Sequence, residues 1–129
     1  MLYKKPKNDH KYEWTNHVVG KMAHYGISES LIKRVVRFPK RVEEGIAPGT
    51  TACMSPYGTP TKDKRQPYRG EVWVMYVAMG RKSTIGNKQL AISHQQKKRI
   101  ITTWRYPGVS RAGASIPIPD EILAEIENL

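Results

Sequence analysis

The chain of 129 residues contains one cysteine, Cys53. A single cysteine excludes an intramolecular disulfide and a cysteine-rich zinc site, and it fits a reducing cytosol. Long apolar runs are also absent: Val72–Met79 is the longest, and eight residues are too few to span a bilayer. The first residues carry charge but no apolar stretch, so we expect no secretory signal and no membrane partner, and we predict a cytoplasmic protein.

Several motifs of enzyme sites are missing as well. No glycine-rich phosphate loop is present, and no pair of histidines has metal-ligand spacing on a helix. We therefore expect no metal and no cofactor.

Acidic residues are few and lie unevenly along the chain. There are 11 of them against 22 lysines and arginines, and the last ten residues hold four acids and no base. Residues 1–119 thus contain 22 bases and seven acids, a net charge of +15. Such an excess favours an anionic partner, most often a phosphate backbone. The alternative is a solvated basic surface that only aids solubility.

Two helices are predicted near the N-terminus. The first follows from apolar residues that recur every three or four positions, namely Trp14, Val18, Met22 and Tyr25. Gly26 suits a left-handed residue that ends this helix, and Ser28 suits the N-cap of a second one. Pro39 disfavours helical backbone in the residue before it, so the second helix should end at Phe38.

Strand patterns follow these helices. They lie at Lys40–Ile46, Thr50–Pro56, Glu71–Met79 and Lys98–Gly108, and the third is apolar on both faces and should be central. We predict an α+β fold in which two N-terminal helices pack on a small antiparallel sheet of about four strands and a short C-terminal helix follows, with the helices on one face of the sheet. We expect a basic flexible arm over residues 1–11, one domain over 12–108, and an irregular segment with an acidic helix over 109–129. Long loops are expected at 56–70 and 81–97.

Short motifs resemble a known group of proteins. The first helix carries His17, then Lys21-Met22, then Gly26-Ile27-Ser28, and the last strand ends in Thr103-Trp104-Arg105. Over about residues 14–106 this pattern resembles the RelE-like and BrnT-like toxin families and the uncharacterised domains grouped with them. The resemblance implies a fold of the barnase, colicin and RelE type, and an acidic antitoxin-like partner.

Metal-free RNA cleavage needs a base, an acid and cations near the phosphate. His17 and His24 are seven residues apart, so they lie on nearly the same line of the first helix. The resemblance favours His17 as general base or acid; the alternative is that both histidines are half-packed boundary residues.

Two arginines are the candidate phosphate clamps. Arg105 lies near the end of an otherwise apolar strand, and its planar fork suits a phosphate. Alternatively, it extends to solvent at the sheet rim or pairs with Glu71. Arg41 starts the first predicted strand, where a side chain is held firmly. The predicted catalytic set is therefore His17, Arg105 and Arg41.

Further RNA contacts are predicted for bases and one tyrosine. This set comprises Lys40, Lys98, Arg99, His24 and Tyr106. For Arg34 and Arg37, a solvated helix face is the preferred interpretation.

These observations predict an RNA-binding protein and leave open whether it is a metal-independent endoribonuclease of toxin type. Two other classes stay open. One is a non-catalytic nucleic-acid or ribosome-binding module. The other is an interaction protein whose basic body is held by an acidic partner. The sequence does not decide between a monomer and a dimer.

Overall fold

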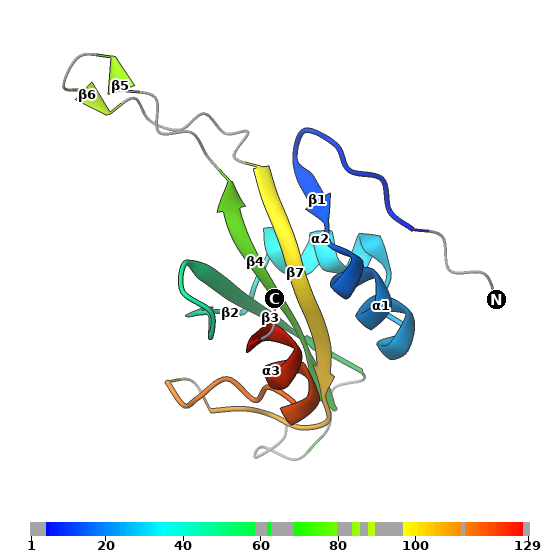
Figure 1. Cartoon of the computed structure of the whole chain (residues 1–129). Helices are drawn as coiled ribbons and strands as arrows, with labels where there is room; N and C mark the ends of the chain where they lie inside the picture. Colours follow the sequence, from blue (N-terminus) through cyan, green and yellow to red (C-terminus); the bar gives the residue numbers. More distant parts are fainter. Residues whose placement is uncertain are drawn as a thin grey trace.

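The protein is built around a five-stranded mixed sheet, seen here in a computed structural model (Figure 1). The structure describes residues 5–58, 62, 69–79, 84–85, 88–89, 97–111 and 113–127. The elements in chain order are β1 (Tyr12–Trp14), α1 (Asn16–Tyr25), α2 (Glu29–Arg37), β2 (Arg41–Glu44), β3 (Thr50–Tyr57), β4 (Gly70–Met79), β5 (Thr84–Ile85), β6 (Lys88–Gln89), β7 (Lys97–Tyr106) and α3 (Asp120–Glu127).

The strand order of the sheet is β1-β7-β4-β3-β2. The four predicted strands are present as β2, β3, β4 and β7, they pair antiparallel, and β4 is central, as its apolar faces predicted. The prediction of about four antiparallel strands was wrong in one respect, because β1 adds a fifth strand parallel to β7. Its three residues are too few to show an alternating pattern, and Trp14 matched the spacing of the helix that follows.

The N-terminal segment leads into β1. Residues 1–4 of the predicted arm lie outside the described residues. Within residues 5–11, the Asn8 side chain accepts a hydrogen bond from the Trp14 N–H, and Asp9 accepts from the N–H groups of Lys11 and Tyr12, all at 2.8 Å. These hydrogen bonds from backbone N–H groups to side chains form turns that direct the chain into β1.

The caps of α1 and α2 follow the sequence signals. Gly26 has a φ of 66°, the left-handed conformation that ends α1, and the N–H of Ile27 bonds to the carbonyl of Met22 at 2.9 Å. The Ser28 hydroxyl accepts a hydrogen bond from the Leu31 N–H and so caps α2. Phe38 leaves helical geometry just before Pro39, as predicted.

Helices lie on both faces of the sheet, which corrects the prediction that they share one face. On the first face, α1 and α2 bury residues such as Val18, Met22 and Ile32 against β4 and β7. On the opposite face, α3 buries Ile122 and Ile126 against Trp73 and other residues of the sheet. Figure 1 shows α2 and α3 on opposite sides of the strands. Burial on both faces requires apolar residues on both faces of β4, and Val72–Met79 supply them.

The remaining predicted features are partly described. Residues 59–61 and 63–68 of the first long loop lie outside the described residues, and in the second loop β5 and β6 form a short antiparallel pair. None of the described helices combines the length and apolarity that a membrane crossing requires.

A buried carboxylate fixes the segment between β7 and α3. Glu71 on β4 is fully buried, and its oxygens accept hydrogen bonds from Trp73 Nε1 (3.1 Å), Ser110 Oγ (2.6 Å) and Ser110 N (3.2 Å). Arg41 donates to Ser110 Oγ at 2.6 Å and to the Ala114 carbonyl at 2.9 Å. A buried charge is tolerated when donors satisfy it in this way.

We predict that Glu71→Gln destabilises the protein. An amide has one acceptor oxygen, and its NH₂ group would face the Ser110 and Trp73 donors. The free energy of unfolding should fall by about 1–3 kcal/mol, the cost of an unsatisfied buried polar group. Urea denaturation measures this effect, and Glu13→Gln, which alters a partly exposed ion pair, is the control. Equal effects of both substitutions would contradict the role assigned to Glu71.

Candidate functional site

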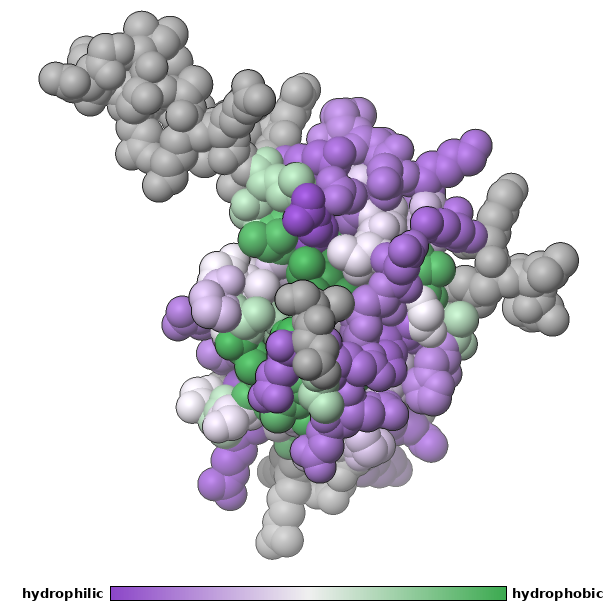
Figure 2. Space-filling model, viewed as in Figure 1, coloured by the Kyte–Doolittle hydropathy of each residue, from purple (hydrophilic) through white to green (hydrophobic). Residues whose placement is uncertain are grey.

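His17 lies where three elements meet. It is the second residue of α1, and its ring contacts both β7 and α3. His17 Nε2 is 2.9 Å from Thr102 Oγ1, and Nδ1 is 3.1 Å from Glu125 Oε2. The side chain is only 13% exposed. Figure 1 shows α1 beside β7, with α3 in front of the sheet, and the surface on the α1 side is largely hydrophilic in Figure 2.

Burial lowers the pKa of His17 below its ordinary value of 6.5, and the positive charge of Lys21 lowers it further. The Glu125 carboxylate acts in the opposite direction but does not outweigh the burial. The ring is therefore neutral at neutral pH. In the tautomer that satisfies both contacts, Nδ1–H donates to Glu125 and Nε2 accepts the Thr102 hydroxyl hydrogen.

The order hydroxyl, imidazole, carboxylate is also that of a hydrolase triad. No local pattern in the sequence indicates this arrangement, because Thr102 is 85 residues from His17 and Glu125 lies on a third element. However, Thr102 is fully buried, so its hydroxyl is closed to a substrate. The contacts instead join α1, β7 and α3. Lys21 adds to this junction through an ion pair with Glu125 at 3.0 Å.

Neighbouring contacts continue the same junction. The Tyr25 hydroxyl donates to Glu121 at 3.2 Å. Burial, together with this hydrogen bond and the charges of Glu121 and Glu125, raises the pKa of Tyr25 to about 12. The acidic face of α3 is therefore partly used in holding α1.

Arg105 is already engaged by the end of α1. Its Nε donates to the Tyr25 carbonyl at 2.8 Å, and its Nη2 donates to the Gly26 carbonyl at 3.1 Å. Its guanidinium also lies 4.8 Å from the centre of the Tyr57 ring. A cation at a helix C-terminus satisfies carbonyls that lack a helical partner. The alternative partner Glu71 faces the opposite side of the sheet, beside Trp73.

The structure does not bring the three predicted catalytic residues together. Arg41 pairs in register with Met54 on the face of Trp73, whereas Arg105 pairs with Val72 on the other face. Arg41 is 8% exposed, and besides Ser110 and Ala114 it contacts Glu43 at 2.8 Å. The sheet thus separates the two arginines.

The predicted RNA contacts are scattered. Arg99 pairs with Glu13 at 2.9 Å, and the Lys98 ammonium lies 5.8 Å from the centre of the Tyr76 ring. Tyr106 packs against the core on the α3 side, and His24 is exposed with its ring edge-on to Tyr25. Lys40 is exposed just before β2.

A second group of bases lies close to Lys40 along the chain. We define the α2 basic surface as Arg34, Arg37 and Lys40, all of which are exposed. Within the part of the chain that the structure describes, the side chains of Arg34 and Arg37 make no ion pair. The sequence has no acid between Glu29 and Glu43.

Phe38 lies within this basic stretch and is 74% exposed. The apolar pattern of the sequence indicates a buried side chain instead, because Phe38 is three residues after the buried Val35 and matches the apolar stripe of α2. The helix has ended at this residue, where φ is −130° and ψ is 60°, so the side chain leaves that stripe. The one local sign of this exposure was Pro39, which predicts that the helix ends at Phe38.

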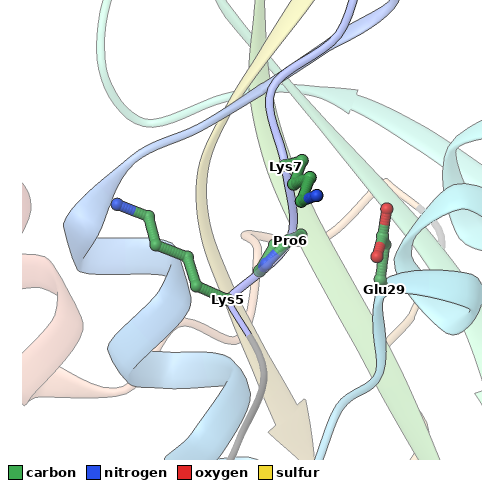
Figure 3. Close-up of a pocket in the computed structure, with 4 residues that line it drawn as sticks. All are labelled: Lys5, Pro6, Lys7 and Glu29. Carbon is green, nitrogen blue, oxygen red and sulfur yellow. The ribbon is translucent and has the colours of Figure 1, made fainter.

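A hollow lies between the N-terminal segment and the start of α2. Lys5, Pro6, Lys7 and Glu29 line it, and Figure 3 shows Lys7 directed toward Glu29 while Lys5 points away. Lys5 donates to the Asn16 side chain at 3.2 Å, and Glu29 pairs with Lys33 at 3.0 Å. A carboxylate in the hollow disfavours a phosphate there. Among the described residues, no three His, Cys, Asp or Glu side chains are grouped as metal ligands would be.

We predict that His17 makes stability depend on pH. Because the pKa of His17 is lower in the folded protein, the unfolded chain takes up the proton first as the pH falls. The free energy of unfolding should therefore decrease as the pH drops below about 6.5, and this loss should stop below the folded pKa. Thermal unfolding between pH 8 and pH 5.5 should show this slope in the wild type and in His24→Gln, and a smaller slope in His17→Gln. Identical slopes in all three proteins would refute the assignment.

We predict that Arg105→Lys affects stability and not RNA affinity. A lysine has a single nitrogen and lacks the planar fork with which the guanidinium donates to both carbonyls. Unfolding free energy should fall by about 1–3 kcal/mol, the range for a hydrogen bond to a charged group. Arg111→Lys, at an exposed position, is the control. A loss of RNA binding at unchanged stability would instead support the phosphate clamp predicted from the sequence.

Comparison with known proteins assigns no family to this geometry. No family model matches the chain, and neither a curated protein nor a solved structure matches it at significant similarity. The resemblance to RelE-like and BrnT-like families therefore stays a prediction from short motifs. Function has to be inferred from the charges, burial and contacts of the chain itself.

Proposed function

We propose that the protein is an RNA-binding domain and that the α2 basic surface is its main phosphate-binding site. The observation that carries this proposal is that Arg34 and Arg37 make no ion pair with any described residue, in a stretch that holds no acid from residue 30 to residue 42. Charges that lack an internal partner keep their full attraction for an external polyanion. Binding of each phosphate also releases a condensed counterion.

Five other bases of the described chain are partly neutralised. Lys21, Lys33, Arg41, Lys97 and Arg99 each lie within 4 Å of a carboxylate oxygen. An ion pair of this kind has to be broken or shared before a phosphate can bind. Arg34 and Arg37, at the C-terminal end of α2, are not neutralised in this way by any described residue and stay available to an external phosphate.

Cleavage of RNA is a separate hypothesis. The ring of His17 is held by Thr102 and Glu125, and Arg41 lies on the other face of the sheet from Arg105. Binding needs none of these residues to converge. The geometry thus supports binding better than catalysis, and catalysis by His17 stays a prediction from the sequence.

We predict that Arg34→Gln/Arg37→Gln weakens RNA binding and its dependence on salt. Fluorescence anisotropy with a labelled 12-nucleotide oligouridine, titrated from low to moderate salt, measures both. For single strands the log–log slope is about −0.7 per neutralised phosphate, so losing two contacts should make the slope less negative by about 1.4.

The control is Lys97→Gln/Arg99→Gln, which removes the same charge from bases that share Glu13. This variant should lose less affinity than the α2 variant. Wild-type binding that is absent, or that is flat with salt, would exclude the proposal. An equal or larger loss in the control would move the site to the start of β7.

A further inference from the structure

Phe38 is unusual among the large aromatic residues of this chain. It is the only phenylalanine, and it is 74% exposed, whereas the three tryptophans are at most 3% exposed. A single exposed apolar residue needs no explanation by itself. The surroundings of Phe38 do call for an explanation, because its neighbours along the chain are three exposed bases, Arg34, Arg37 and Lys40.

The backbone holds Phe38 firmly. Its N–H donates to the Arg34 carbonyl at 2.9 Å, and its carbonyl accepts a hydrogen bond from Ser55 Oγ at 3.4 Å. Pro39 follows, and the N–H of Lys40 then bonds to the Met54 carbonyl at 2.8 Å. The ring is thus presented from a fixed point between α2 and β2. Such preorganisation reduces the entropy lost on binding.

We propose that Phe38 is a stacking platform for an unpaired base, and that the α2 basic surface therefore selects single-stranded over double-stranded RNA. This inference rests on the proposed function. Proteins that bind single strands combine basic side chains along the backbone with aromatic rings on which bases stack. In a duplex the base faces are covered by neighbouring pairs, so the ring has nothing to stack on.

A protein partner would use the same ring differently. Val42 on β2 is 56% exposed, so an apolar contact could include both residues. The observations favour RNA, because Arg34 and Arg37 make no ion pair among the described residues and a phosphate backbone would supply the negative charges that they attract. An apolar contact depends on volume, whereas stacking depends on a flat π face. Leucine keeps the first property and removes the second.

The experiment compares Phe38→Leu, Phe38→Trp and the control Val42→Ala on two ligands, the 12-nucleotide oligouridine and a 12-base-pair RNA duplex. Phe38→Leu should weaken single-strand binding by about 5- to 100-fold and leave duplex binding unchanged. Phe38→Trp should keep the single-strand affinity. The new indole fluorescence should be quenched by the oligouridine beyond any change in the wild type, whose three tryptophans are buried. Val42→Ala should bind both ligands as the wild type does.

The outcomes separate this inference from the proposed function. If the wild type shows no salt-dependent RNA binding, the proposed function fails. If binding depends on Arg34 and Arg37 but Phe38→Leu retains full single-strand affinity, the stacking platform is wrong and the phosphate site stands. Equal loss on both ligands, or no quenching in Phe38→Trp, also overturns stacking. Circular dichroism of each variant confirms that the fold is kept.

Discussion

The arrangement of the sheet face on which α3 packs depends on one buried carboxylate. Glu71 sits in the central strand, and leaving it unpaired in the core would be costly. Ser110 satisfies it, and Ser110 is in turn held by Arg41. The segment after β7 is thereby drawn back across the sheet, where the Pro117 carbonyl accepts a hydrogen bond from Trp104 Nε1 at 3.0 Å. This path places α3 over the tryptophans.

The position of α3 then determines the surroundings of His17. Ile122 and Ile126 anchor α3 in the core, and Glu125 on the same helix reaches the imidazole on α1. A histidine that would border solvent at the edge of β7 becomes a mostly buried, neutral group. His17, which the sequence predicted to be a general base or acid, thus links the two helical layers.

Local signals in the sequence predicted the elements better than their relations. The cap at Ser28, the left-handed Gly26 and the central position of β4 follow from patterns within a few residues. The second helical layer does not, because α3 shows an apolar stripe but no sign of which face receives it. The contacts of His17 join residues 17, 102 and 125, and such distant pairings leave no local pattern. The total charge likewise predicted a polyanion partner, but only the ion pairs show which bases are neutralised within the protein.

The parallel pairing of β1 with β7 has a consequence for how the chain folds. It joins Tyr12 to Lys98 and Trp14 to Ile100, so one edge of the sheet closes only when segments more than 80 residues apart have met. Contacts of such sequence separation slow folding, because loop-closure entropy is lost before the contact forms. During synthesis, β4 is complete before its partner β7 has been made. The apolar strand β4 then has one unpaired edge in the nascent chain. During this interval that edge can pair with another chain, so aggregation is favoured.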